Sequence, residues 1–407
     1  MSSVVIAGDT SGSVTLQAPA IAGSTVLTLP ATSGTIALTS GSSSITTPIV
    51  NSTTSLSLQT NNGTNALVLD ASQNATFAKT INASNTFGFK NRLINGNMQI
   101  WQRGTSGTAS GYNFVSVDRW AGGPFSAYQV LSQSASVPNG GSQYSLKVQR
   151  TASQTNTGPI IAMQVIESTN CYDLSGQQVT LSFWAKAGAN FSASSSFLNV
   201  QVATGTTADQ GGVSYYSWTG AANPINSGVT LTTTWTKYTL TGTFGVGVLE
   251  AAALLYFTPT GTAGADDSFY ITQVQLEVGS QATSFDQRSI GTETALCQRY
   301  YYKVSAGGYQ IYAIGTGYGT TSTRFCLPLP VTLRAAVSSW DFSAANTFLC
   351  EVGNGSGTVV PTATNSTGNN TQNTFQISLT VSGATSGSPY NLYSNGTASY
   401  IGVGAEL

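Results

Sequence analysis

Apolar residues in the first 88 positions recur in pairs separated by one small or polar residue. The pairs are Val14/Leu16, Leu27/Leu29, Ile36/Leu38, Leu56/Leu58 and Leu67/Leu69. Alternation with a period of two is typical of β-strands that bury one face. Each short strand brings too few apolar side chains to bury a core within one chain. We therefore expect residues 41–88 to form an intertwined β-shaft of a homotrimer. The alternative is a disordered linker rich in serine and threonine.

From about residue 90 the pattern changes to longer strands that carry aromatic residues. The strand-like runs lie at 144–148, 179–186, 235–240, 269–276, 309–314, 325–333, 375–381 and 398–402. Turn clusters such as Asn139-Gly140-Gly141 separate them. The segment 291–302 has apolar residues near a 3.6 period, so we expect a hinge helix there. The pattern predicts an all-β protein with two β-sandwich (jelly-roll-like) domains, at 89–290 and 291–407.

Charge is scarce throughout the chain. Charged residues make up 7% of the sequence and the net charge is −1, whereas about 25% is usual. Nucleic-acid binding needs clustered Lys and Arg, so it is not expected. The start, Met1-Ser2-Ser3-Val4, has no charged segment followed by an apolar one, and the longest apolar stretch, 246–257, is too short to cross a bilayer. We expect synthesis in a cytoplasm and no membrane insertion.

The four cysteines are widely spaced and the sequence has no histidine. They are Cys171, Cys297, Cys326 and Cys350. Without Cys-x-x-Cys pairs or histidine, a zinc site has almost no ligands. We expect buried free thiols of a reducing compartment and no cofactor.

Catalytic groups are equally sparse. A glycan-cleaving enzyme needs two carboxyl groups that flank one bond, and the single adjacent pair is Asp266-Asp267. If this pair lies in a strand, its side chains face opposite ways. Without histidine there is no Ser-His-Asp triad. Gly315-x-Gly317-x-Gly319 lacks a following helix and is interpreted as a turn. We therefore expect a non-enzymatic protein.

Five motifs in a fixed order resemble the modules of bacteriophage tail fibres and tailspikes. Residues 91–105 read NRLINGNMQIWQRGT, and Val117-Asp118-Arg119-Trp120 follows. The later motifs are LSFWAKA at 181–187, VQLEVG with ATSF at 274–285, LCQRYY at 296–301 and YIGVGAEL at 400–407. The 181–187 strand also resembles the central strand of carbohydrate-binding jelly rolls. One departure is Thr332-Leu333-Arg334, where the family usually has Met-Arg.

The resemblance covers residues 90–407, and segments 11–16 and 28–35 look like the N-termini of phage fibres. It implies a trimeric virion appendage, with 1–40 anchoring the chain to other virion proteins and the distal domains binding a host surface glycan or other receptor. The open alternatives are a glycan-degrading tailspike and a capsid decoration fibre without a receptor role. Glu277 caps a loop or, as in related jelly rolls, helps to bind a structural calcium ion.

Two groups of residues are candidates for the site. Sugar recognition uses aromatic faces for stacking, and exposed rings are expected on loops and domain ends. These ligand-binding candidates are Tyr112, Tyr215, Tyr216, Trp218, Tyr318 and Tyr390; core packing is the alternative for each. The second group is a structural motif of ion pairs and sealing indoles, with ligand binding as its alternative. Its members are Trp101, Arg103, Asp118, Arg119 and Trp120.

Overall fold

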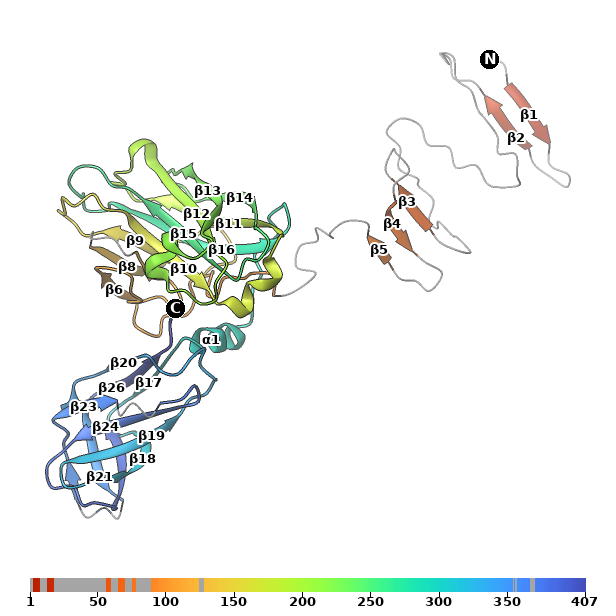
Figure 1. Ribbon diagram of the computed structural model, residues 1–407. Coiled ribbons are helices and arrows are strands. Elements are labelled where there is room, and N and C mark those ends of the chain that lie inside the picture. Colours follow the sequence, from red (N-terminus) through yellow and green to blue (C-terminus); the bar gives the residue numbers. More distant parts are fainter. Residues whose placement is uncertain are drawn as a thin grey trace. The chain divides into compact units, whose positions relative to one another are not determined.

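The computed structural model describes residues 3–7, 13–17, 56–59, 65–69, 75–77, 89–123, 128–353, 355, 357–366 and 370–407. The chain divides into two units, Met1–Ile81 and Asn82–Leu407 (Figure 1). Almost all of the regular structure is β, as the sequence predicts.

The first unit contains two small antiparallel sheets. One pairs β1 (Ser3–Ala7) with β2 (Ser13–Gln17). The other has the order β3 (Leu56–Gln59), β4 (Asn65–Leu69) and β5 (Ala75–Phe77). Leu56 lies opposite Leu69, and Leu58 opposite Leu67, so the two predicted leucine pairs meet in one register. The Leu27/Leu29 and Ile36/Leu38 pairs lie outside the described residues. The homotrimeric shaft concerns other copies of the chain and stays a prediction.

The second unit begins with a sandwich of two antiparallel sheets. The five-stranded sheet has the order β13 (Ala222–Thr230), β12 (Phe197–Gly205), β15 (Glu250–Phe257), β10 (Ile160–Ile166), β7 (Ala121–Gly122). The six-stranded sheet has the order β14 (Thr236–Thr243), β11 (Gln178–Ala187), β16 (Ser268–Val278), β9 (Ser145–Arg150), β8 (Gln129–Ser134), β6 (Ser106–Ala109). Short 3₁₀ turns at Ser168–Asn170, Tyr172–Leu174, Ser194–Ser196 and Gly212–Ser217 interrupt the loops.

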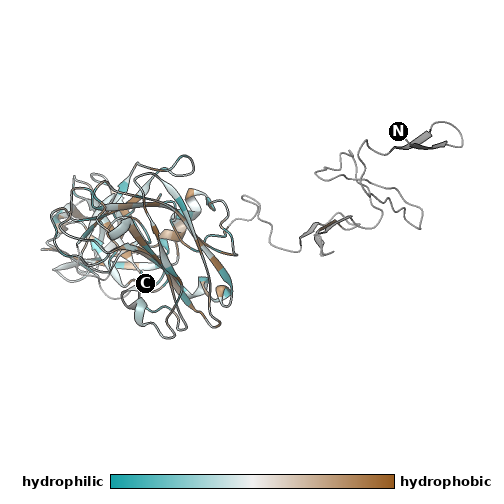
Figure 2. Cartoon of the chain, turned by 90° about the horizontal axis from the view of Figure 1, so that it is seen from above, coloured by the Kyte–Doolittle hydropathy of each residue, from teal (hydrophilic) through white to brown (hydrophobic). Residues whose placement is uncertain are grey.

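The main core fills the space between these two sheets. Phe183 of β11, Leu255 of β15 and Phe269 of β16 are among its fully buried members. Figure 2 shows brown, hydrophobic stretches along strands of this unit. The four runs predicted at 144–148, 179–186, 235–240 and 269–276 correspond to β9, β11, β14 and β16, so these predictions are confirmed.

The alternating pattern did not reveal the strands of the five-stranded sheet or β6 and β8, and β10 and β15 show one reason for this. Nearly every residue of both strands is buried, because they have protein on both faces. A strand buried on both sides shows a continuous apolar run instead of alternation.

A second buried cluster explains what covers the outer face of the five-stranded sheet. Met163 of β10 and Leu254 of β15 point away from the main core and pack with Tyr215, Trp218 and the C-terminal Leu407. The indole Nε1 of Trp218 donates a hydrogen bond to the carbonyl oxygen of Gly211, 3.1 Å away. The loop that contains the Gly212–Ser217 turn is therefore folded down onto the sheet.

Glu250, the first residue of β15, holds this loop on the sheet. Its carboxylate accepts a hydrogen bond from the backbone N–H of Gln210, 2.6 Å away, and the side chain is buried. Burial raises the pKa of Glu250 to about 7, although the hydrogen bond from Gln210 opposes the rise. The charged carboxylate is therefore less stable in the folded protein than in water.

We expect Glu250 to make the protein less stable as the pH rises from about 4.5 to about 7. Below this window the carboxyl group is protonated in both states. Within it the unfolded chain releases the proton while the folded chain keeps it, so the stabilisation is lost as the pH passes the folded pKa. The full difference amounts to at most about 3 kcal/mol. Urea unfolding from pH 4 to 8 tests this: the excess stability of the wild type over Glu250→Gln should decline across the window, and a constant difference would contradict it.

The second sandwich follows the helix α1 (Ile290–Gln298), whose N-cap Ser289 accepts from the N–H of Thr292. The predicted helix is thus confirmed, although it ends earlier than 302, and its role as a hinge stays a prediction. A three-stranded sheet has the order β17 (Tyr301–Ala306), β26 (Ser399–Gly404), β20 (Ser339–Phe342). A seven-stranded sheet has the order β22 (Thr358–Val359), β21 (Phe348–Val352), β25 (Pro389–Ser394), β18 (Ile311–Gly317), β19 (Ser322–Pro328), β24 (Thr374–Thr380), β23 (Ala363–Ser366). A 3₁₀ turn, Ala345–Thr347, precedes β21.

Two details of this sandwich differ from the expectations. The predicted strand at 325–333 ends at Pro328. Gly315 and Gly317 lie within β18, and the turn is limited to Gly319. A Cβ at Gly315 would lie 2.0 Å from the carbonyl oxygen of Arg324, so the glycine allows two strands to approach.

All four cysteines are free thiols, as the sequence predicts. Cys171, Cys297 and Cys350 are buried, but Cys326 is exposed on β19, contrary to the expectation of four buried thiols. Within the described residues, no helix has the length and apolar character needed to cross a membrane.

Candidate functional site

The structure separates the predicted ligand-binding aromatics into buried and exposed rings. Tyr215, Trp218 and Tyr390 are only 7%, 3% and 1% exposed. The prediction that Tyr215 and Trp218 are exposed was wrong, because their loop covers the apolar face of the five-stranded sheet. Tyr390 lies in the core of the second sandwich. These three rings are therefore not available for stacking on a ligand.

Of the other three candidates, Tyr112 and Tyr216 lie at the same loop, since Tyr112 packs on the cluster of Tyr215 and Trp218, and the rings of Tyr215 and Tyr216 are 5.5 Å apart. Tyr112 is half-buried, and its hydroxyl donates to the carbonyl oxygen of Leu407. Tyr216 and Tyr318 are 66% and 58% exposed, but they lie in different sandwiches. Tyr318 holds the guanidinium of Arg324 at 3.4 Å from its ring centroid. The structure therefore does not bring the six candidates together into one site.

The Trp-Gln-Arg and Asp-Arg-Trp motifs meet the C-terminal segment where the two sandwiches join. The buried guanidinium of Arg119 pairs with Glu406, donates to the carbonyl oxygen of Val165 at 2.7 Å and lies 3.5 Å from the ring centroid of Tyr300. Arg103 pairs with the same carboxylate at 3.1 Å. Arg103 and Arg119, from the motifs at 91–105 and 117–120, therefore both pair with Glu406 of the C-terminal motif.

Asp118 holds the other side of this junction. Its carboxylate accepts hydrogen bonds from the backbone and side chain of Gln102 at 2.6 and 2.8 Å, and Arg103 lies 3.8 Å away. Burial raises the pKa of Asp118 to about 6, although Arg103 and Gln102 oppose the rise. The indoles of Trp101 and Trp120 donate to backbone carbonyls of Met98 and Asn95. Asp118 and both indoles thus have partners within the protein, which fits the structural role, although Arg103 Nη1 and Arg119 Nε are buried without a hydrogen bond to the described residues.

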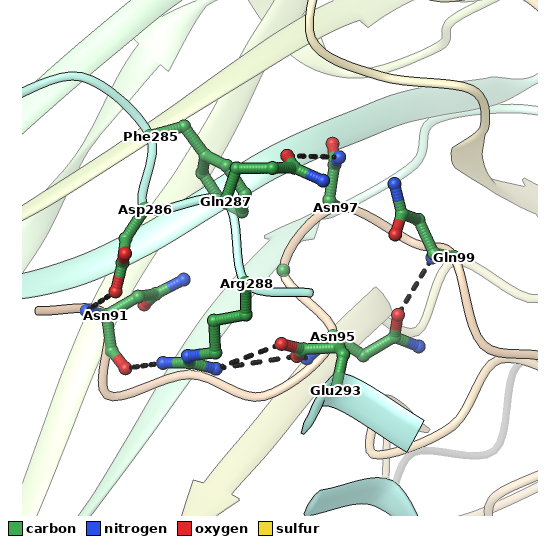
Figure 3. Close-up of a pocket in the computed structure, with 10 residues that line it drawn as sticks. Asn91, Asn95, Asn97, Gln99, Phe285, Asp286, Gln287, Arg288 and Glu293 are labelled. Atoms are coloured by element: carbon green, nitrogen blue, oxygen red, sulfur yellow. Dashed lines mark hydrogen bonds and ion pairs between the residues drawn. The ribbon is translucent and has the colours of Figure 1, made fainter. Parts of the chain in front are cut away.

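The Asn-x-x-x-Asn-Gly motif forms a closed polar junction beside β16 (Figure 3). Beyond Ile271, where the pairing with β9 ends, residues 92–96 bond to β16 in its place. Arg288 pairs with Glu293 at 3.3 Å and donates to the backbone of Asn91, while Glu293 accepts from the N–H of Asn95. Most of the polar groups bind one another, with Arg288 Nε as a buried exception, and we interpret this small pocket as part of the scaffold.

The remaining carboxylates also have structural partners. Asp267 and Arg150 form a fully buried pair at 3.3 Å, and Asp266 pairs with Lys147 at 2.8 Å. The two aspartates lie just before β16, and not within a strand as considered from the sequence. Glu277 accepts from the N–H and hydroxyl of Thr283 at 2.8 and 2.7 Å, so it caps the loop after β16. Among the described residues, no three acidic, cysteine or histidine side chains cluster to hold a metal ion.

The outer face of the six-stranded sheet is different, because it presents aromatic and basic side chains. Along β11, Phe183 and Ala185 belong to the core. Trp184 and Lys186 therefore point to the opposite face. On β16, Phe269 and Ile271 belong to the core, so Tyr270 also points outward.

Strand register places these outward side chains in adjacent rows. Lys186 is opposite Tyr270, and Tyr270 is opposite Lys147 on β9. In the neighbouring row, Trp184 is opposite Lys237 on β14. Directly opposed residues have Cβ atoms about 4.5–5.5 Å apart, so their side chains are in contact range.

Ring contacts join Lys147, Lys186 and Tyr270 with the neighbouring Trp235 into one surface, beside which the strand register places Trp184 and Lys237. The ammonium of Lys186 lies 4.5 Å from the ring centroid of Tyr270 and 5.6 Å from that of Trp235. The centroids of Trp235 and Tyr270 are 6.4 Å apart in an edge-to-face arrangement. We refer to the set as the aromatic–lysine platform; its members are Lys147, Trp184, Lys186, Trp235, Lys237 and Tyr270.

The platform occupies the accessible half of this face. In the other half, Gln275 and Glu277 are buried although they point outward, because the segment 279–288 folds over them. Gln275 accepts from the N–H of Asp286 at 2.7 Å. By contrast, Lys237 is exposed and the other platform side chains are half-buried. The platform is therefore open to a ligand, and the segment 279–288 forms a raised wall along one side of it.

A groove lies next to this wall. It has a volume of about 430 Å³ and is lined by Gly140, Gly141, Gln273, Phe285 and Gln287. Gln273 follows Tyr270 by three residues on β16, which corresponds to about 10 Å along a strand. It occupies a bulge with φ of 51°, where the register with β11 shifts. The amide group of Gln273 is therefore about 10 Å from Tyr270 of the platform, which is close to the length of a disaccharide.

Sequence reasoning missed the platform. Its signal was the alternation Phe183-Trp184-Ala185-Lys186, in which an aromatic and a basic residue share the solvent face of a strand. Its members lie in or next to strands, whereas aromatic residues on loops are the usual sequence signal for a binding site. Pairing with β16 and β9, which joins residues far apart in the sequence, was needed to assemble the rows.

No protein-family model and no curated protein matches this sequence. Among solved structures, the chain is similar to the enzymatically active domain of tailspike protein 4 from bacteriophage CBA120, at 16% identity over 50% of this chain and 24% of that chain, with a TM-score of 0.29. It is also similar to a CBM4 structure (20% identity, 37% and 78% of the two chains, TM-score 0.24). A third is the CBM22-1–CBM22-2 tandem of Paenibacillus barcinonensis Xyn10C (12%, 80% and 100%, 0.26). At these values the likeness extends to neither ligand nor activity.

Proposed function

We propose that this chain is a non-enzymatic bacteriophage fibre protein that attaches the virion to a host cell by binding surface glycans. The carrying observation is the aromatic–lysine platform, which offers the faces of Trp184 and Tyr270 beside polar and charged groups. Flat aromatic rings bind the apolar faces of sugars, and neighbouring polar groups fix their orientation.

The remaining parts of the proposal rest on the sequence. The motifs at 91–105 and 117–120 support a place in a phage fibre or tailspike, because their family likeness covers residues 90–407. The short leucine-pair strands support a homotrimer wound together through residues 41–88, and segment 1–40 would attach it to other virion proteins. Three platforms in one fibre would bind together, so weak single-site affinity, on the order of millimolar, would be multiplied by avidity.

The proposal excludes glycan cleavage. Asp266, Asp267 and Glu406 each face a cation at ion-pair distance. Carboxylates engaged in this way are bound to protein cations, whereas the two carboxyl groups of a glycan-cleaving enzyme must flank the scissile bond. This favours attachment over the tailspike alternative.

Replacing Trp184 with alanine is expected to weaken glycan binding about tenfold, because one stacking face contributes on the order of 1 kcal/mol at each site and avidity multiplies the loss. The full chain would be applied to a microarray of bacterial surface polysaccharides. Tyr270→Ala is expected to weaken glycan binding by a similar factor. Tyr216→Ala is the matched control, since it removes an exposed ring outside the platform.

Three results would count against this proposal. Loss of binding in Tyr216→Ala but not in Trp184→Ala would move the site to the loop. Release of new reducing ends from a bound polysaccharide would support the degrading tailspike. Failure of the wild type to bind any host polysaccharide or host cell would favour the decoration fibre.

A further inference from the structure

We propose that the aromatic–lysine platform selects acidic glycans, that is, polysaccharides whose sugars carry a carboxylate, sulfate or phosphate group. This inference rests on the proposed function and names its ligand class. It is derived from the distribution of cations over the structure and from the spacing of the platform lysines.

The arginines of the described residues are almost all neutralised by the protein. Seven of them form ion pairs with carboxylates. The eighth, Arg324, lies over Tyr318. A chain with only 14 cations therefore uses its arginines mainly for internal contacts.

The lysines are used differently. Half of the six lysines in the sequence lie on the platform. Lys186 and Lys237 make no ion pair with any described carboxylate, whereas Lys147 pairs with Asp266 at 2.8 Å. Three ammonium groups and one carboxylate give the platform a net charge of +2. In a protein of net charge −1, this is a local excess of positive charge on a surface open to solvent.

The arrangement of the lysines fits a polymer of charged sugars. Lys186 and Lys147 flank Tyr270 on the two neighbouring strands. Two inter-strand spacings separate them, which is about 10 Å and close to the length of a disaccharide. A sugar ring stacked on Tyr270 would therefore have an ammonium group on either side. Lys237 beside Trp184 repeats the combination in the next row.

Neutral glycans would leave this charge unused. The ammonium of Lys186 already lies over the rings of Tyr270 and Trp235, so a neutral sugar would displace a cation from the aromatic face without gaining an ion pair. An acidic sugar would gain both the stacking contact and the ion pair. Single-stranded nucleic acid is a different polyanion, but its binding grooves follow the backbone with a longer basic track than three lysines provide.

The test compares polymers that differ only in charge. Polygalacturonate and its methyl ester share one backbone, as do dextran sulfate and dextran. We expect the full chain to bind polygalacturonate or dextran sulfate at least about tenfold more tightly than the neutral counterpart, and to lose this preference between about 0.05 M and about 0.5 M salt. The preferred member shows whether the platform selects carboxylate or sulfate.

Variants test whether this preference for acidic polymers comes from the platform lysines. Lys186→Gln combined with Lys237→Gln should weaken binding of the acidic polymer about tenfold and so abolish the preference for it over the neutral counterpart. Lys186→Arg, which keeps the charge, should retain most of the affinity. Lys303→Gln is the matched control: its ammonium also lies over a tyrosine ring, 3.7 Å from that of Tyr400 in the second sandwich. Thermal melting of each variant shows that it is folded.

Four other outcomes would each refute the inference. Equal binding of charged and neutral polymers, lost in Trp184→Ala, would refute acidic selectivity and leave the proposed function standing. An equal loss in Lys303→Gln would show non-specific attraction. Tighter binding of oligothymidylate with the same lysine dependence would indicate a nucleic-acid site. Binding to no polymer, and to no polysaccharide on the microarray, would refute both proposals.

Discussion

Replacing Arg119 with alanine is expected to lower the free energy of unfolding by about 3 to 5 kcal/mol, because it leaves a buried carboxylate without its main partner. Arg119 is fully buried, pairs with Glu406 and stacks on Tyr300. Arg119 comes from the first sandwich, whereas Glu406 and Tyr300 come from the segments that begin and end the second. The loss should therefore affect both domains in one transition.

Urea unfolding followed by tryptophan fluorescence would measure this effect. Arg324→Ala is the control, since its guanidinium also lies over a tyrosine ring but pairs with no described carboxylate, and it should cost less than about 1 kcal/mol. A double-mutant cycle with Glu406→Gln should give a coupling energy of at least about 1 kcal/mol. Additive losses would show that the two side chains do not act as a pair.

Replacing Asn95 with alanine is expected to destabilise the protein by a similar amount, about 3 to 5 kcal/mol. Its side-chain oxygen accepts from the N–H groups of Gln99 and Ile100 at 2.8 and 3.0 Å. Its amide donates to the carbonyl oxygens of Ile100 and Asp118 at 2.9 and 3.1 Å. Each lost buried hydrogen bond costs about 1 kcal/mol, and alanine tolerates the positive φ of 55° less well than asparagine.

Thermal unfolding of Asn95→Ala and Asn199→Ala would test this prediction. Asn199 makes a single long hydrogen bond, 3.4 Å to the carbonyl oxygen of Tyr256. Its replacement should lower the unfolding free energy by less than about 1 kcal/mol. If the two variants melted at the same temperature, the motif at 91–105 would not have the stabilising role that its contacts indicate.

The segment around Asn95 also supports the sheet that carries the platform. Residues 92–96 bond to β16 where its pairing with β9 ends, so this strand has hydrogen-bonding partners on both sides. Arg119 fixes the second sandwich to the first. Rigid elements position binding groups more accurately than loops do.

The sequence by itself determined the β class, most strands of the six-stranded sheet and the helix α1. Alternation of Val179, Leu181 and Phe183 with polar residues places one face in a core, and this information is local. The scarcity of charge also pointed to an ion pair among Arg103, Asp118 and Arg119. The structure places Arg103 3.8 Å from Asp118, whereas Arg119 pairs with Glu406, which the sequence did not indicate as its partner.

Tertiary structure decided which aromatic rings are accessible. Trp218 and Tyr215 lie in a polar, glycine-rich loop, where exposure is expected. They are buried because that loop folds onto Met163 and Leu254, two apolar residues on the outer face of β10 and β15. Since strands buried on both faces show no alternation, the sequence pattern gave no sign that this face needed a cover.

The platform was decided by pairing across strands. Lys147, Lys186, Lys237 and Tyr270 come from four strands that are far apart in the sequence, and each is an ordinary solvent-facing residue when its strand is considered alone. Only the register of β9, β16, β11 and β14 sets them side by side. Register depends on contacts between distant segments, because a shift by one residue would move every platform side chain to the core face.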